Sequence, residues 1–482
     1  MKSLFIKRSF LLCAILCLIT AGCKVTFGGC AIVVMAVGLI QIFQKKYGRA
    51  AVCYLFVMLL QIMTPILVGG SLANIAGKMT IAFFAIAGLM SARRGKSSCA
   101  PALGLLFAYA AYMVIPSSFG WFPLISYLKI VAFICMLVSL ALLCRGLAIT
   151  AEDVLWTRSG AMAVCAFIVW GSIAAWFFPA VGYSMQINKL AVWQRYVTGS
   201  DIASGAVGGV SLFSGVLMHS QVLSTILVAV FAWLVCDMFF AERRIGWFHS
   251  LIIAPVPVLI YMTRSRTGLF AFAITSLFIL IYSLRHALVP RRVKSAVALS
   301  SFVVVLLMCA YVGVQQARNG LLEKWLLKSS GEGDLTVENV ASSRMGKIDE
   351  NMYDFHQNPL IGKGFQTSED HRYLYQVGAI SIFSAPVEKS VTPLMVLGEG
   401  GVVGGLIFIA FLICFVRHAI KNKNMSTLSL FVAFFLVNLG EASIFSPSGQ
   451  GGVLWALVLL GGVATDSMVK LQNEQEMFWG RL

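Results

Sequence analysis

The chain is divided into long apolar runs, and this feature limits the possible fold more than any other. A transmembrane helix needs about 20 consecutive apolar residues to cross the hydrocarbon core of a bilayer. About fourteen such runs follow one another, at 9–22, 25–43, 50–69, 72–91, 98–116, 121–144, 159–178, 209–240, 247–263, 267–285, 294–314, 392–416, 426–444 and 451–466. We therefore predict an all-α, polytopic membrane protein with about 14 transmembrane helices.

The composition excludes two other classes of protein. Charged residues make up 12% of the chain and hydrophobic residues 59%, whereas soluble domains carry roughly 25% charged residues. The formal net charge is +17, but the basic residues sit in short clusters between apolar runs. A nucleic-acid-binding protein gathers them on one solvated face, so we predict no nucleic-acid partner.

The positions of these basic clusters predict the orientation. When the N-terminus is placed inside, every strong cluster falls on the inner side, as the positive-inside rule requires. The clusters are Lys45-Lys46 with Arg49, Arg93-Arg94 with Lys96, Arg243-Arg244, Arg285 with Arg291-Arg292 and Lys294, and Arg417 with Lys421 and Lys423. Both termini are then cytoplasmic.

One long polar segment divides the chain into helices 1–11 (1–314), a large loop on the outer side (315–391), and helices 12–14 with a cytoplasmic tail (392–482). The loop holds eight Lys/Arg against ten Asp/Glu. Ala341–Phe355 has apolar residues at spacings of three and four, which predicts a short amphipathic helix. The Pro and Gly residues of Asn358–Phe365 predict an ordered turn.

The N-terminal apolar run has two interpretations. The run that ends at Cys23 looks like a signal peptide with a lipoprotein-type cleavage box, but a further apolar run begins at Val25, which favours a first transmembrane helix.

The twelve cysteines and six histidines form no cluster with metal-ligand spacing. We therefore predict no metal and no cofactor.

Arg264 and Arg266 break the charge rule, because they lie between two runs on the predicted outer side. They can be anchors whose charged ends reach the interface. They can also form an anion site, since a guanidinium forks onto phosphate and stays charged when partly buried. Two arginines against the charge rule favour the anion site.

Other polar residues near the outer side are candidates for the same site. Arg195 lies in the second long outer segment, Pro179–Gly208, and Arg344 opens the predicted loop helix. His356 and His371 lie in the large loop, where a single histidine is usually solvated. Carboxylates near a membrane are costly; Glu399 and Glu441 are either functional or helix-end residues bonded to backbone N–H groups.

Four segments, in this order, resemble the bacterial O-antigen ligase and O-antigen polymerase family. The segments are Arg195–Gly199, Thr263–Ala271, Arg344 followed by Asn358–Phe365, and Leu394–Gly404. The resemblance covers about 190–410 and rests on order, spacing and topology together. It implies metal-independent glycosyl transfer from an undecaprenyl-diphosphate-linked glycan at the periplasmic face, without a nucleotide.

The resemblance also implies roles for individual residues. Arg195 and Arg266 would bind the diphosphate and stabilise its charge as it leaves, with Arg264 and Arg344 as further candidates. The family ligases have a histidine, the expected general base, where this chain has Ser390. Serine cannot take that role unaided, so Glu388 or His371 would substitute for it.

This departure favours a polymerase of an envelope or exported polysaccharide over the ligase, which transfers the glycan to lipid A–core. A polymerase would work beside the bilayer with flippase and chain-length regulator proteins. From a different class, the alternative is a transporter or flippase for lipid-linked sugars. A transporter is expected to have paired halves or interrupted helices with intramembrane charge.

Overall fold

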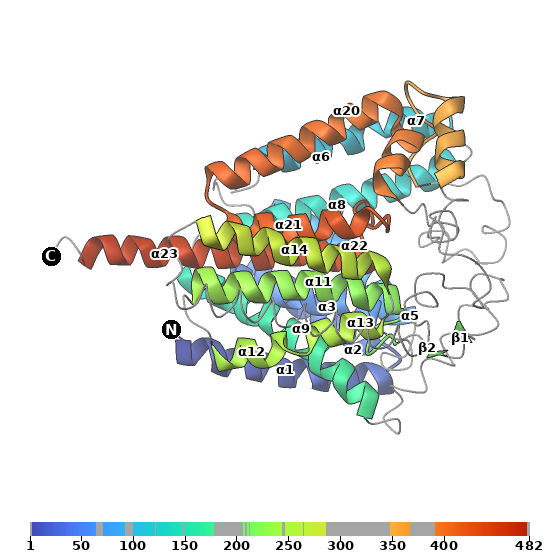
Figure 1. Ribbon diagram of the computed structural model, residues 1–482. Helices are drawn as coiled ribbons and strands as arrows, with labels where there is room; N and C mark the ends of the chain where they lie inside the picture. Colours follow the sequence, from blue (N-terminus) through green and yellow to red (C-terminus); the bar gives the residue numbers. More distant parts are fainter. Residues whose placement is uncertain are drawn as a thin grey trace, which may run out of the picture.

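The protein is a bundle of helices, as the apolar runs predict (Figure 1). The computed structural model describes residues 2–63, 71–91, 100–120, 122–147, 150–177, 206–207, 210–211, 213–242, 246–263, 265–285, 348–366 and 391–479. Within these residues, eight helices are long and apolar enough to cross a membrane, and five further apolar helices are shorter. The helical membrane architecture is confirmed. The number of about 14 spans stays a prediction, because the run at 294–314 lies outside the described residues.

The helices follow the order of the predicted runs. The first group comprises α1 (Lys2–Val25), α2 (Gly29–Phe43), α3 (Tyr47–Ile62), α5 (Ser71–Ser91), α6 (Ala100–Tyr112), α7 (Val114–Ser118), α8 (Pro123–Leu147) and α9 (Ala151–Phe177). The second group comprises α11 (Ser220–Cys236), the π-helix η2 (Asp237–Ala241), α12 (Trp247–Ile253), α13 (Val256–Met262) and α14 (Arg266–Arg285). The last group comprises α20 (Thr392–Lys421), α21 (Met425–Asn438), α22 (Gly449–Ala456), the π-helix η3 (Leu457–Gly462) and α23 (Val463–Trp479).

Two features lie outside this pattern. The strands β1 (Ala206–Val207) and β2 (Val210–Ser211) form a small antiparallel pair. The predicted large loop is described only over 348–366, where residues 348–357 form a helix. This helix overlaps the amphipathic segment that the sequence predicts.

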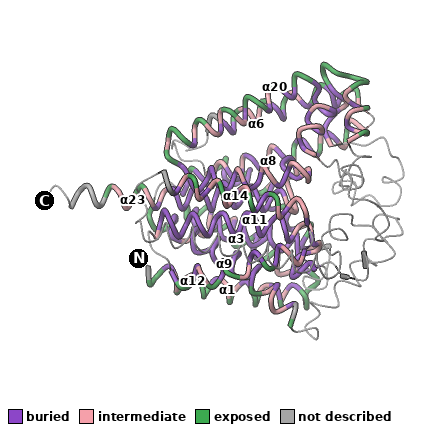
Figure 2. Tube along the Cα trace, viewed as in Figure 1, coloured by how far each residue is buried: buried purple, intermediate pink, exposed green. Residues whose placement is uncertain are grey.

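The centre and the edge of the bundle differ in burial (Figure 2). α11 and η2 form one continuous helix at the centre, and 94% of its most apolar segment is buried within the protein. In α1, only 28% of the most apolar segment is buried. The exposed residues of α1 include Leu4, Phe10, Leu11 and Leu18, and soluble proteins rarely expose so many large apolar side chains together. These exposed faces therefore fit contact with lipid.

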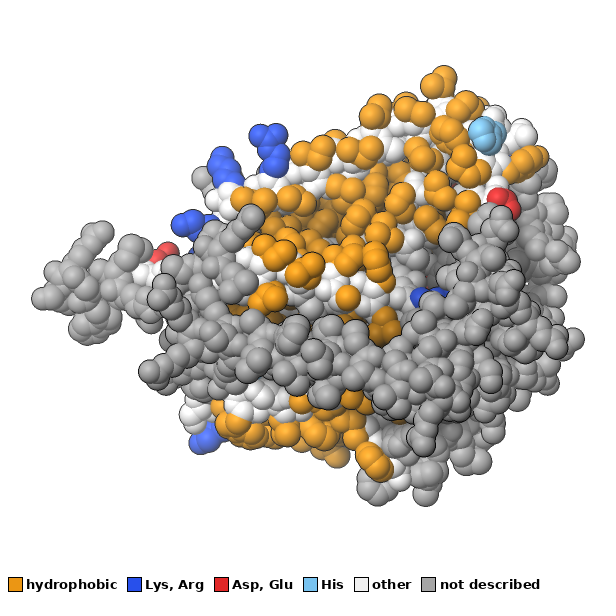
Figure 3. Space-filling model, viewed as in Figure 1, with side chains coloured by type: hydrophobic (Ala, Val, Ile, Leu, Met, Phe, Trp, Pro, Cys, Tyr) orange, Lys and Arg blue, Asp and Glu red, His pale blue; other side chains and the backbone are white. Residues whose placement is uncertain are grey.

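The helices define two ends of the molecule. At the end where α1 begins and α23 ends, many of the described basic residues gather (Figures 1 and 3). They include Lys45, Lys46, Arg49, Arg417, Lys421 and Lys423. We call this the basic end. At the opposite end, α3 finishes and α11, α14 and α20 begin. The side of the membrane that the basic end faces stays a prediction.

Candidate functional site

Four of the ten candidate site residues belong to the described part of the chain: Arg266, Glu399, Glu441 and His356, the last of which is exposed on the helix 348–357. Arg266 is the first residue of α14, and Glu399 lies in the first third of α20. The helix α21 packs against both α14 and α20. The other predicted residues lie outside the described residues: Arg195, Arg264, Arg344, His371, Glu388 and Ser390.

The start of α14 is fixed by close packing around the half-buried Arg266. The Ser265 hydroxyl accepts a hydrogen bond from the backbone N–H of Gly268 at 3.2 Å, which caps the helix. Gly268 itself lies so close to Ser224 of α11 that any side chain at this position would collide with it. Arg266 therefore extends from a helix start that has little freedom to shift.

The segment after α21 is organised by one side chain, Asn438. Its amide oxygen accepts hydrogen bonds from the backbone N–H groups of Ser443 at 2.7 Å and Ile444 at 2.8 Å. The hydroxyl of Thr392, at the start of α20, donates to the backbone oxygen of Glu441 at 3.2 Å. Glu441 is thus part of an ordered turn that joins the ends of α20 and α21.

Helix α20 is interrupted at Gly401, whose φ of 62° and ψ of −164° lie outside the helical region. The interruption frees backbone groups on both sides, and the segment 358–366 bonds to them. Val402 donates its N–H to the oxygen of Pro359 at 2.8 Å. On the other side, the oxygen of Glu399 accepts the N–H of Gly364 at 3.0 Å. The predicted ordered turn is therefore confirmed.

Glycines allow this close approach. Gly362 has a φ of 79°, and a Cβ there would lie 2.2 Å from the backbone oxygen of Glu399. Tyr112 of α6 completes the junction, because its hydroxyl donates to the backbone oxygen of Gly400 at 2.9 Å. The Glu399 side chain has no exposed surface. A buried carboxylate beside a helix interruption is thus a strong candidate for a functional residue.

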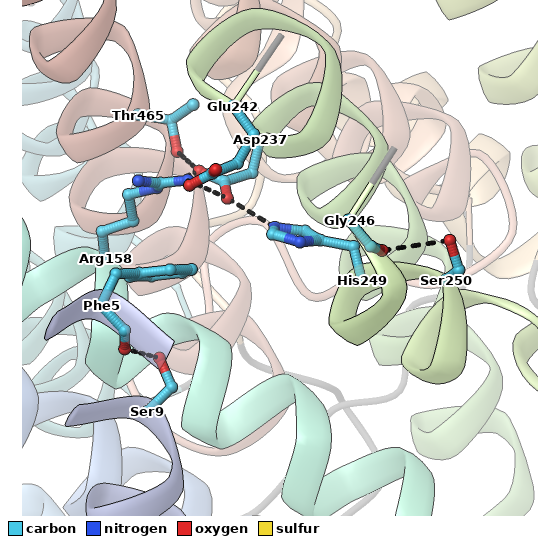
Figure 4. Close-up of polar contacts among 9 residues, drawn as sticks. All are labelled: Phe5, Ser9, Arg158, Asp237, Glu242, Gly246, His249, Ser250 and Thr465. Carbon is cyan, nitrogen blue, oxygen red and sulfur yellow. Dashed lines mark hydrogen bonds and ion pairs between the residues drawn. The ribbon is translucent and has the colours of Figure 1, made fainter. Parts of the chain in front are cut away.

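A row of buried, mutually bonded polar side chains lies near the basic end (Figure 4). The sequence did not predict it. Arg158 of α9 donates from Nε to Asp237 Oδ1 at 2.6 Å and from Nη2 to Glu242 Oε1 at 2.6 Å. His249 Nε2 of α12 lies 2.9 Å from Asp237 Oδ2. Thr465 of α23 donates to Asp237 Oδ1 at 3.0 Å. We call Arg158, Asp237, Glu242 and His249 the ion chain.

The ion chain is almost entirely shielded from solvent. The side chains of Arg158 and Asp237 are 3% and 0% exposed, and the ring of Phe5 on α1 lies 4.1 Å from the guanidinium carbon. The guanidinium of Arg158 lies between the carboxylates of Asp237 and Glu242, so each of these three buried charges has an opposite neighbour. Asp237 was the signal available in the sequence, since an acid inside an apolar run requires a partner.

Two π-helical segments adjoin the ion chain. Asp237 begins η2, and η3 ends three residues before Thr465. The widened turn of a π-helix leaves backbone groups free for other donors, and the thiol of Cys144 donates to the oxygen of Leu459 in η3 at 3.0 Å. Asp237 accepts four hydrogen bonds, so the ion chain ties helices together and does not offer an open base.

The described residues contain no group of three or more His, Cys, Asp or Glu that could hold a metal ion. No family model matches this chain, and no curated protein matches it.

Proposed function

We propose that this protein polymerises undecaprenyl-diphosphate-linked oligosaccharide repeats into an envelope or exported polysaccharide at the periplasmic face of the bacterial inner membrane. The observation that carries the proposal is the position of Arg266. It begins α14 at the end opposite the basic end, where the charge rule disfavours arginine. The close contacts of Gly268 and Ser265 hold this helix start in place.

The reaction needs positive charge at such a position. The hydroxyl oxygen of the acceptor sugar forms a bond to the anomeric carbon of the donor, while the bond from that carbon to the diphosphate oxygen breaks. The diphosphate leaves with one more negative charge, and the hydroxyl proton passes to a base, for which Glu388 and His371 are the candidates. A guanidinium forks onto the leaving diphosphate and stabilises its charge.

The experiment is replacement of Arg266 in a strain that depends on this gene for its polysaccharide. Loss of one electrostatic contact to a developing negative charge costs about 100-fold or more in rate, so Arg266→Ala should abolish long polymer. Arg266→Lys should retain a small part, because lysine keeps the charge but not the fork. Arg417→Ala is the matched control, since Arg417 is an exposed arginine at the basic end. Normal polymer length in Arg266→Ala at normal protein level would refute the proposal.

The O-antigen ligase is the alternative within the same class. A ligase transfers a finished glycan to lipid A–core, whereas a polymerase lengthens the glycan on its lipid carrier. A deletion strain separates the two activities by the species that accumulates. Single lipid-linked repeats indicate a lost polymerase, and long lipid-linked polymer indicates a lost ligase.

A flippase for lipid-linked sugars is the second candidate, and the interruption of α20 favours it. Interrupted transmembrane helices beside buried charge are typical of transporters, and α20 is interrupted at Gly401 beside buried Glu399. Membrane-impermeant labelling of glycans in spheroplasts of a deletion strain distinguishes the candidates. Accumulated repeats are labelled from outside if polymerisation is lost, and are protected if transport is lost.

A further inference from the structure

Arg8 of α1 and Arg49 of α3 meet on one aromatic ring near the basic end. The guanidinium carbons lie 4.6 Å and 5.0 Å from the ring centroid of Trp156 on α9. All three residues belong to the first two turns of their helices, and α9 packs against both α1 and α3. Two separate helices thus bring their arginines to one tryptophan.

The two arginines share an acidic neighbour, Glu152, to which neither is hydrogen-bonded. Glu152 Oε1 accepts a hydrogen bond from Trp156 Nε1 at 3.2 Å. It lies 3.8 Å from Arg8 Nη2 and 3.6 Å from Arg49 Nη2, which is too long for a hydrogen bond. Arg8 Nη1 is buried and has no hydrogen-bond partner in the described part of the chain. A buried donor of this kind is costly unless something binds to it.

The surroundings combine further positive charge with an apolar surface. Lys45 and Lys46 precede Arg49 closely and are exposed. On α1, Leu4 and Leu11 flank Arg8 in sequence and expose 45% and 56% of their surface. Arginines that only reach toward water would each turn outward separately. Here the side chain of Arg8 is 18% exposed, and both guanidinium groups are held at the same ring.

We propose that Arg8, Arg49 and Trp156 form a binding site for the phosphodiester headgroup of an anionic phospholipid. The phosphate oxygens accept hydrogen bonds from the Arg49 guanidinium, whose side chain is 41% exposed, and lie beside the positive charge of Arg8 at the same ring, while the acyl chains lie along the exposed leucines of α1. Basic pockets between transmembrane helices bind anionic headgroups in this manner. The site does not depend on the proposed glycosyl transfer.

The test measures lipid binding to the full-length protein in neutral detergent, by native mass spectrometry during titration with phosphatidylglycerol. Each arginine beside an anionic headgroup contributes about fivefold to affinity, so the double variant Arg8→Gln/Arg49→Gln should bind phosphatidylglycerol roughly 20-fold more weakly. Lys421→Gln/Lys423→Gln is the matched control, because Lys421 ends α20 and Lys423 follows it, and both are exposed at the same end. Its affinity should stay within about twofold of the wild-type value.

Two further arms complete the test. Phosphatidylcholine shows whether net negative charge is required, and inorganic phosphate shows whether a free anion binds equally well. If the double variant fails to fold, Arg49→Gln replaces it, since Arg49 is 41% exposed, with an expected loss of about fivefold. Equal phosphatidylglycerol affinity in wild type and a folded variant overturns the proposal. So does a preference for inorganic phosphate over the lipid.

Discussion

The two regions of buried charge in this protein are built in different ways. Near the basic end, Arg158, Asp237, Glu242 and His249 bond directly to one another through their side chains. Toward the opposite end, the described contacts around Arg266 and Glu399 are made largely by backbone: a capped helix start, an interrupted helix and glycines at close approach. The first region joins helices, and the second fixes the positions from which individual charged residues extend.

This difference predicts different consequences of substitution. In the ion chain, removal of one charge leaves another charge buried without its partner, so the fold should suffer. At the opposite end, the cap and the glycine contact that fix the start of α14 do not involve the Arg266 guanidinium, so its removal should lower activity more than it lowers stability. Measurement of folded yield and of polymer length in the same variants tests the comparison directly.

The largest effect on stability is expected for Asp237→Ala. This variant leaves Arg158 and His249 without their shared carboxylate, and breaking a buried ion pair in this way costs about 3–5 kcal/mol. We expect little monodisperse protein after detergent extraction and a markedly lower melting temperature. Arg266→Ala is the comparison and should extract as the wild type does. Equal stability of the two variants would show that the ion chain does not hold the fold together.

Removal of both partners should be less harmful than the single changes suggest. In Arg158→Met/Asp237→Leu, this pair is replaced by apolar side chains, so neither of its two charges remains buried without the other. The contact of Arg158 with Glu242 is lost in Arg158→Met and in the double variant alike, so it cancels in the comparison. The loss of unfolding free energy in the double variant should be about 1–3 kcal/mol smaller than the sum of the losses in the two single variants. Thermal unfolding of Arg158→Met, Asp237→Leu and the double variant measures this coupling. Additive losses would contradict direct pairing inside the bundle.

The interruption of α20 predicts a smaller loss of stability and a specific loss of activity. In Gly401→Ala, the residue keeps a positive φ that costs about 1–3 kcal/mol, and its Cβ would lie 2.4 Å from the backbone of Leu360. The segment 358–366 should then leave the helix, with reduced polymer length. Gly104→Ala in α6 is the control, since a Cβ there meets nothing within 4 Å. Limited proteolysis reports whether the segment has separated.

The sequence predicted the helices well, because hydrophobic length is a property of each run by itself. It also predicted that Asn358–Phe365 is ordered, from its Pro and Gly residues. It did not identify the interruption at Gly401, because Gly398, Gly400, Gly404 and Gly405 lie nearby. Only the contacts with Pro359 and Leu360 determine which of these glycines takes a positive φ.

The ion chain could not be predicted for a similar reason. Arg158 and Asp237 are 79 positions apart, and Thr465 is 228 positions from Asp237. Their pairing depends on how α9, η2 and α23 pack together. An acid inside an apolar run indicates that some partner exists, but one sequence does not identify that partner.

The smallest effect on stability is expected at the start of α14. A change in the position of Arg266 can be separated there from a loss of the fold. Ser265→Ala removes the cap on the N–H of Gly268, which costs about 1 kcal/mol, too little to unfold the bundle. Because Arg266 follows directly, the looser helix turn should lower polymer length without changing the amount of extracted protein. Ser265→Asp keeps an N-cap acceptor but adds a negative charge beside Arg266, whereas Ser265→Thr keeps the hydroxyl alone. If polymer is restored in Ser265→Thr but not in Ser265→Asp, both the position of Arg266 and the charge beside it matter. If polymer is unchanged in Ser265→Ala, Arg266 does not need a rigid helix start.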